Sequence, residues 1–209
     1  MAASAVLNTR EIYMEKRLLT IIAASLLAFA LTGCNELKDP RDGKIYRTVK
    51  IGKQVWMAEN LNYKAGDSYC YEDNPAKCQK YGRLYTWNAA YEACPMGWHL
   101  PSKDEYRMLF KTVGGIVDGK YWTGVANNIK STKGWNNDGN GVDAFGFSVL
   151  PAGYRDEEGF YRYEGSRAHF WSSTEEAGHR NSAYGVFLDA AHFDGDSKNH
   201  GFSVRCIQN

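Results

Sequence analysis

Apolar and polar residues alternate over residues 46–51, which read Tyr-Arg-Thr-Val-Lys-Ile. Gly52-Lys53 follows, and Gln54–Met57 resumes an apolar pattern. A period of two is typical of a β-strand, and a two-residue turn that contains glycine is typical of a hairpin. We therefore expect a β-hairpin over residues 46–57.

Two later segments carry apolar residues at helical spacing. The first covers residues 84–93 and ends before Pro95. The second begins at Ser102, which forms a capping-box pattern with Glu105, and it ends at Gly114-Gly115. The apolar face of this second helix is predicted to consist of Tyr106, Leu109, Phe110 and Val113.

The remaining segments predict loops and short strands. Residues 60–80 and 116–146 are rich in polar residues and glycine, so we expect loops there. Residues 156–159 and 194–199 are predicted hairpin tips. The predicted strands are Phe147–Leu150, Phe160–Tyr163, His169–Ser172, Ala183–Leu188 and Phe202–Cys206. The pattern predicts an α+β domain of two helices, short antiparallel strands and long loops.

An apolar run near the N-terminus has a different origin. Leu18–Leu31 spans 14 residues, fewer than the roughly 20 that a membrane-spanning helix needs. It follows Glu15-Lys16-Arg17, and a basic start before a short apolar run is typical of a secretory signal peptide. We assign residues 1–33 to a signal peptide. Because Met14 begins a compact signal of its own, residues 1–13 are a mis-called start or a dispensable extension.

The run ends in Leu31-Thr32-Gly33-Cys34, which resembles a bacterial lipobox. The resemblance implies cleavage before Cys34, attachment of acyl chains such as palmitate to it, and export as a lipoprotein. Asn35 then favours the outer membrane, on its periplasmic or surface face. We expect residues 34–41 to be a lipidated tether, residues 42–209 to form one domain, and the membrane to be a partner through the anchor.

Charge excludes one class of partner. Residues 1–33 contain three basic and two acidic residues, so the 176 residues that follow carry 22 of each sign. Nucleic-acid-binding proteins usually present a clustered basic face, and no such run appears. We therefore expect no nucleic-acid partner.

Cysteine usage agrees with export. Four cysteines follow Cys34, and four cysteines allow three pairings. Cys70 and Cys78 bracket a polar stretch and would staple a loop, in which case Cys94 and Cys206 would join the middle of the chain to its end. The spacings of a zinc site are missing, so we expect disulfide bonds, which an exported protein can form.

Several blocks together resemble the Fibrobacter succinogenes major paralogous domain. Over roughly residues 41–208 they are Asp42–Tyr46, Ile51–Tyr63, Tyr81–Trp87, Cys94–Ser102, Phe147–Tyr154, Phe170–Glu175 and Gly201–Cys206. The resemblance implies a C-type-lectin-like fold, similar to that of formylglycine-generating enzymes. It also favours the pairing of Cys94 with Cys206. It implies no particular reaction.

Two kinds of candidate ligand site remain. Asn136, Asp138 and Asn140 supply oxygen atoms in a compact turn, as calcium requires, but an ordinary Asn/Gly turn explains them as well. The chain has 6 Trp, 14 Tyr and 9 Phe. The aromatic residues in or beside loops either bind sugar rings or pin the loops to the domain; they are Trp122, Trp135, Tyr154, Tyr161 and Tyr163.

A catalytic site is not indicated. The sequence has no nucleophile elbow, zinc-binding helix, phosphate loop or dinucleotide fingerprint, so we assign no catalytic residue. We expect a non-catalytic surface binding or adhesion module whose preferred ligand is a glycan, with no cofactor other than the calcium candidate. The alternatives are binding to a cell-surface protein, a structural envelope role, and an enzyme related to formylglycine-generating enzymes.

Overall fold

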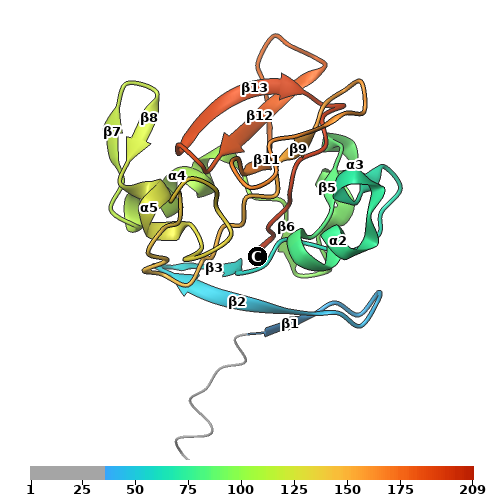
Figure 1. Cartoon of the computed structure of the whole chain (residues 1–209), viewed down its shortest axis with the longest axis horizontal. Helices are drawn as coiled ribbons and strands as arrows, with labels where there is room; N and C mark the ends of the chain where they lie inside the picture. Colours follow the sequence, from blue (N-terminus) through green and yellow to red (C-terminus); the bar gives the residue numbers. More distant parts are fainter. Residues whose placement is uncertain (1–35) are drawn as a thin grey trace, which may run out of the picture. The chain divides into compact units, whose positions relative to one another are not determined.

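The computed structural model describes residues 36–209. The predicted signal peptide and Cys34 lie outside the described residues. Short strands predominate over helices in the described part (Figure 1). None of the helices described in residues 36–209 has the length and apolar character needed to cross a membrane.

The first sheet brings the two ends of the domain together. Its order is β1 (Glu36–Lys38), β2 (Ile45–Ile51), β3 (Gln54–Met57), β14 (Ile207–Gln208) and β6 (Trp98–His99). The predicted hairpin is confirmed as β2–β3. The tether prediction was wrong for residues 36–38, which pair with β2. Leu37 lies opposite Tyr46, and both pack against the core, which explains why this segment is a strand.

A second five-stranded sheet forms most of the other half. It is antiparallel and runs in the order β11 (His169–Glu175), β12 (Ser182–Phe187), β13 (His192–Ser197), β8 (Tyr121–Thr123) and β7 (Ile116–Asp118). Two small sheets complete the strands: β4 (Ser68–Tyr69) with β5 (Leu84–Tyr85), and β9 (Tyr154–Arg155) with β10 (Tyr161–Arg162).

The helical elements are short. They are η1 (Tyr71–Asp73), α2 (Pro75–Tyr81), α3 (Trp87–Ala93), α4 (Lys103–Thr112) and α5 (Val125–Ile129). The capping box is confirmed, since the Glu105 amide donates to the Ser102 hydroxyl at 3.2 Å and the Ser102 amide donates to the Glu105 carboxylate at 2.7 Å. Helix α3 begins at Trp87 rather than at Leu84, because Leu84 and Tyr85 pair with β4.

Two predicted loops contain regular structure. Residues 60–80 contain β4, η1 and most of α2. Helix α2 begins with Pro75, and the Asn74 side chain accepts a hydrogen bond from the Ala76 amide at 3.0 Å. These are ordinary helix-start signals. Residues 116–146 contain the β7–β8 hairpin and α5.

Three other predictions were wrong in detail. Phe147–Leu150 and Phe202–Cys206 make isolated bridges instead of strands. The segment 194–199 is not a hairpin tip, because β13 covers most of it and pairs along its length with β12. The tip at residues 156–159 is confirmed, and it joins β9 to β10. Tertiary pairing has overridden local turn preference in β13.

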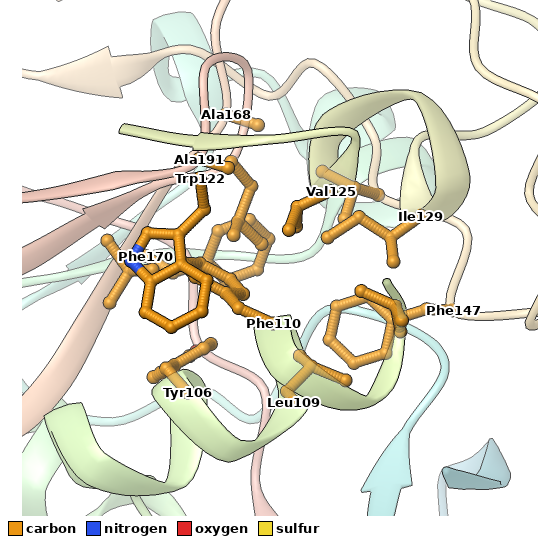
Figure 2. Packing of buried hydrophobic residues seen from close by; sticks show 14 of the residues in the cluster. Tyr106, Leu109, Phe110, Trp122, Val125, Ile129, Phe147, Ala168, Phe170 and Ala191 are labelled. Atoms are coloured by element: carbon orange, nitrogen blue, oxygen red, sulfur yellow. The ribbon is translucent and has the colours of Figure 1, made fainter. Parts of the chain in front are cut away.

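Two clusters of buried side chains form the core. The first cluster joins helices α4 and α5 to the second sheet, which includes β8. Figure 2 shows Tyr106, Leu109 and Phe110 of α4 packed in this cluster. Phe170 of β11 enters this cluster, whereas the next residue, Trp171, enters the second. Because neighbouring side chains of a strand point to opposite faces, β11 is buried on both sides and forms a rigid support.

Both expected disulfides are formed in the structure. Cys70 pairs with Cys78 across 8 residues, and Cys94 pairs with Cys206 across 112 residues. The first closes the segment that contains η1 and the start of α2. The second joins the end of α3 to the last residues before β14.

Candidate functional site

The structure separates the two candidate tryptophans from the candidate tyrosines. Trp122 is 9% exposed and Trp135 is 7% exposed, and both belong to the first core cluster. The Trp135 indole N–H donates to Ser131 Oγ at 3.1 Å and to the Val149 carbonyl at 3.2 Å. Neither ring is open to a ligand, so these two residues pin their loops to the domain. Their assignment as ligand-binding candidates is corrected accordingly.

The β9–β10 hairpin divides the three tyrosines between its two faces. Tyr161 pairs with Arg155 and Arg162 pairs with Tyr154, so Tyr161 lies on the face opposite to Tyr154. The Tyr161 hydroxyl donates to Asp73 at 2.7 Å, and its ring lies 5.2 Å from that of Tyr71. Tyr161 therefore attaches the hairpin to η1 and does not join the other two tyrosines.

Tyr154 and Tyr163 do come together. Their rings stack with centroids 5.9 Å apart, and Tyr163 is 51% exposed. The Arg167 guanidinium carbon lies 4.6 Å from the Tyr163 ring centroid, and Arg162 Nε donates to Asp156 at 2.9 Å. We call these five residues the tyrosine face. It combines one exposed aromatic ring with two guanidinium groups and a carboxylate.

Local sequence explains the shape of this hairpin. Asp156 closes the turn, because its carboxylate accepts from the Phe160 amide at 2.7 Å and its carbonyl accepts from the Gly159 amide at 3.0 Å. Gly153 precedes β9 with a φ of +65°, and a Cβ at that position would overlap the Arg162 carbonyl. A glycine is therefore required for β10 to pass this close.

A buried histidine packs against Tyr154 of the tyrosine face. His169 of β11 is 3% exposed and stacks under Tyr154 with ring centroids 4.7 Å apart. Neither of its ring nitrogens has a hydrogen-bond partner among residues 36–209, and Asp189 lies 3.9 Å from Nε2. Burial is the main cause and nearby Arg167 a smaller one, and together with the other neighbouring charges they lower the pKa of His169 to about 3.

His200 lies on the other side of Tyr154 and has the opposite electrostatics. Its ring centroid is 5.9 Å from that of Tyr154, and its Nδ1 is 3.2 Å from Asp196. The hydrogen bond to Asp196 raises the pKa of His200 despite partial burial. Two histidines that contact the same tyrosine therefore favour different protonation states.

These pKa shifts predict the acid dependence of stability. Between pH 6.5 and about 3 the unfolded chain binds a proton at His169 that the folded protein does not bind. Above pH 6.5 the neutral His169 therefore costs the folded protein no stability. Below pH 6.5 the free energy of unfolding decreases by up to about 1.4 kcal/mol per pH unit because of this group. His200 acts oppositely, because its stabilisation is complete below pH 6.5 and is lost as pH rises through its raised pKa.

We expect the substitution His169→Phe to flatten the decline in stability between pH 6.5 and 4. Urea unfolding at several pH values measures this slope, with His200→Gln as the control that keeps His169 and its burial, the largest cause of its lowered pKa. A His169→Phe protein that keeps the wild-type slope would show that another group causes the acid sensitivity.

The family model described as the Fibrobacter succinogenes major domain matches residues 49–208. The chain belongs to this family. The match includes both disulfides, the hairpin β9–β10 and all of the second sheet. A search of curated proteins gives no match. The family assignment therefore comes from the domain as a whole, without a characterised relative to supply an activity.

In this Fibrobacter succinogenes major domain, one buried arginine joins three sequence blocks. Arg205 is fully buried and donates from Nε to the Asn60 side chain at 2.9 Å and from Nη2 to the Ser148 carbonyl at 2.8 Å. It also donates from Nη1 to the Phe147 carbonyl. Its partners belong to the blocks Ile51–Tyr63 and Phe147–Tyr154, so Arg205 fixes the segment that leads into β9.

The calcium candidate has few oxygen ligands to offer. Asn136, Asp138 and Asn140 are exposed, and the Asn140 side-chain oxygen already accepts from the Trp135 amide at 3.1 Å. Only Asp138 contributes a carboxylate, whereas calcium usually takes six to eight oxygen ligands. Within residues 36–209 no group of three or more His, Cys, Asp or Glu side chains is placed to hold a metal ion.

Sequence reasoning missed three members of the tyrosine face, namely Asp156, Arg162 and Arg167. A signal was present, because charged residues alternate with tyrosines around the predicted turn at 156–159. That alternation shows that the segment forms a hairpin, but it does not show which side of the hairpin is open. The register of β9 with β10 is needed for that assignment.

Proposed function

We propose that the chain is an exported lipoprotein, anchored through Cys34, whose domain is a non-catalytic module that binds a glycan at the tyrosine face. The exposed ring of Tyr163 is the observation that carries this proposal. Sugar rings present C–H groups that pack on aromatic faces, and guanidinium and carboxylate groups bond to their hydroxyls. The tyrosine face supplies an exposed ring and two guanidinium groups, and the buried Asp156 carboxylate orients one of these, Arg162.

We infer a C-type-lectin-like fold for this module. Three features support it: the first sheet joins the two ends of the domain, α3 and α4 are both placed in the first half, and Cys94 just after α3 pairs with Cys206 near the C-terminus. Lectin-like domains carry their ligand sites on long loops held by such a scaffold. The loops and small hairpins between α4 and β11 are the counterpart in this chain.

The support beneath Tyr163 favours binding through a rigid surface. Tyr154 stacks between Tyr163 and His169, and β11 under His169 is buried on both faces. A ligand therefore meets a ring that is already positioned, which reduces the entropy lost on binding. Arg167 next to this ring would favour a glycan that carries carboxylate groups.

We expect Tyr163→Ala to weaken glycan affinity about 2- to 13-fold, because one aromatic contact contributes about 0.5–1.5 kcal/mol. Isothermal titration of the purified protein with the glycan measures the change. Tyr91→Ala is the matched control, since Tyr91 is 57% exposed on α3 and its ring lies against Trp87 and not against a residue of the tyrosine face. Equal losses in the two variants would contradict the assignment of the site.

Binding to a cell-surface protein is the second candidate function. The β7–β8 hairpin favours it, because Ile116 is 71% exposed and Val117 is 60% exposed on β7, the edge strand of its sheet. Exposed apolar side chains on an edge strand are typical of a surface that pairs with another chain. A protein partner would then be lost on Ile116→Lys and unaffected by Tyr163→Ala.

A thiol-dependent reaction like that of formylglycine-generating enzymes receives no support from Cys206. Its side chain is fully buried and bonded to Cys94. A nucleophilic cysteine has to be reduced and accessible. A binding role for the domain is consistent with this buried disulfide.

A further inference from the structure

The proposed anchor leaves very little chain between the membrane and the fold. Only Asn35 separates Cys34 from Glu36, the first residue of β1. At about 3.3–3.6 Å per residue, the Cα atoms of Cys34 and Glu36 are at most about 7 Å apart. Glu36 is held in the sheet opposite Arg47. An acyl chain on Cys34 would thus hold this part of the first sheet at the level of the lipid headgroups.

A hollow of about 270 Å³ lies at this same part of the domain. Arg47, which pairs with Glu36, contributes to its wall together with Ile45 of β2. The opposite wall includes Gln79 and Lys80 at the end of α2. The hollow therefore lies beside β2, the strand that pairs with the first strand after the proposed lipidation site.

The charges around the hollow are unevenly paired. Lys44 Nζ lies 2.8 Å from Asp42, and Arg47 Nε lies 3.5 Å from Glu59. Lys80 pairs with no carboxylate among residues 36–209, and its ammonium lies 4.5 Å from the Tyr81 ring centroid. The carboxylate on which Lys80 acts, Glu164, is already paired with Lys77 at 2.5 Å. A net positive charge therefore remains beside the hollow, although residues 34–209 are neutral overall.

Two further residues complete this surface. Lys38 of β1 also forms no ion pair with a carboxylate of the described residues, and it lies opposite Ile45 on the same face of the sheet. Ile45 is 58% exposed. Cations that flank an exposed apolar side chain match the boundary between charged headgroups and acyl chains.

We propose that the hollow and Lys38 form a membrane-contact surface that receives the phosphate group of an anionic phospholipid. This inference rests on the proposed lipidation of Cys34. We assign the ligand as a membrane lipid because the short tether would hold this surface against the headgroups. The tether would not hold a glycan or a protein at this place. The lipid then fixes the orientation of the domain in addition to retaining it.

The test uses the full chain, processed in a bacterial host and reconstituted into vesicles. One set of vesicles is pure phosphatidylcholine and the other contains phosphatidylglycerol as well. Amide hydrogen exchange is measured at residues 44–47 and 79–82, with residues 154–163 as the internal reference. We expect slower exchange at the first two segments in the anionic vesicles only, and no change at the reference.

Charge variants make the test specific. The double variant Lys38→Gln with Lys80→Gln removes two cations of the surface. Each substitution is expected to reduce the slowing of amide exchange by anionic vesicles about fivefold. Lys120→Gln with Lys133→Gln is the control, because it removes the same net charge from exposed positions outside the surface. Equal exchange in both kinds of vesicle, or equal behaviour of the two double variants, would overturn the proposal.

Mass spectrometry of the N-terminal peptide separates failure of this inference from failure of the proposed anchor. A lipid found on Cys34 without slower exchange leaves the lipoprotein intact and overturns the membrane-contact surface. An unmodified Cys34 overturns both. A lipid together with slower exchange that the Lys38/Lys80 variant loses supports the surface.

Discussion

Replacing Cys94 and Cys206 together with alanine is expected to lower the free energy of unfolding by about 4–5 kcal/mol. The bond closes a loop of 112 residues, and the entropy that such a loop removes from the unfolded chain corresponds to this amount in the chain-entropy model. Since small domains have only about 5–15 kcal/mol of stability in total, the variant will be close to unfolding at room temperature. Urea denaturation under oxidising conditions measures the loss.

The second disulfide provides the matched control. Cys70 and Cys78 are 8 residues apart, so the same model gives about 2.5 kcal/mol for their removal. A loss for the Cys94/Cys206 variant that is no larger than the loss for the Cys70/Cys78 variant would contradict the view that the long-range bond stabilises the attachment of α3 to the C-terminal segment.

Replacing Arg205 with methionine is expected to cost about 3 kcal/mol of stability. The substitution keeps an unbranched side chain but leaves the Asn60, Phe147 and Ser148 oxygens without their donor. Each buried acceptor that loses its partner costs about 1–3 kcal/mol. The net loss is smaller than the sum of these costs, because the variant no longer has to bury the charge of the guanidinium group. Burial lowers the pKa of Arg205 to about 9, so the group is still charged at neutral pH.

Two further variants test this interpretation of Arg205. Arg205→Lys keeps the charge but cannot reach three oxygens from one ammonium group, so it should be nearly as unstable. Arg47→Met changes an exposed arginine of the first sheet and should alter stability by no more than about 0.5 kcal/mol. Chemical denaturation compares the three proteins. A fully stable Arg205→Lys protein would mean that charge alone is needed at this position.

The elements that the sequence predicted well are those with complete local signals. The β2–β3 hairpin combines strict alternation with Gly52-Lys53, and α4 combines an apolar face with a capping box at Ser102 and Glu105. Local chemistry and tertiary packing agree in both cases. Helix α2 was missed because its start signals, Asn74 and Pro75, lie in a polar segment that gives no amphipathic pattern over seven residues.

Other elements could not be predicted because distant residues determine them. Asp194-Gly195-Asp196 has the composition of a turn, yet it is extended in β13 because β12 pairs with it residue by residue. The segment at Leu37 reads as a tether until Tyr46 is known to lie opposite. Such pairings depend on the whole sheet, so a local pattern cannot indicate them.

The candidate site, too, could be predicted only in part. Composition indicated that loop aromatics mattered, but it could not distinguish the buried Trp122 and Trp135 from the exposed Tyr163. Tyr163 adopts a left-handed backbone with a φ of 60°, which turns the chain directly after β10. Its stacking on Tyr154 depends on this turn and on the β9–β10 register.

The most direct test of the account is binding of residues 35–209 to a panel of polysaccharides, with calcium and with chelator. This fragment contains both core clusters and both disulfides, so it holds everything that stabilises the domain. We predict binding to at least one glycan, insensitive to chelator, weakened by Tyr163→Ala and unchanged by Tyr91→Ala. Absence of binding across the panel, or binding that Tyr163→Ala leaves intact, would contradict the tyrosine face as a glycan site.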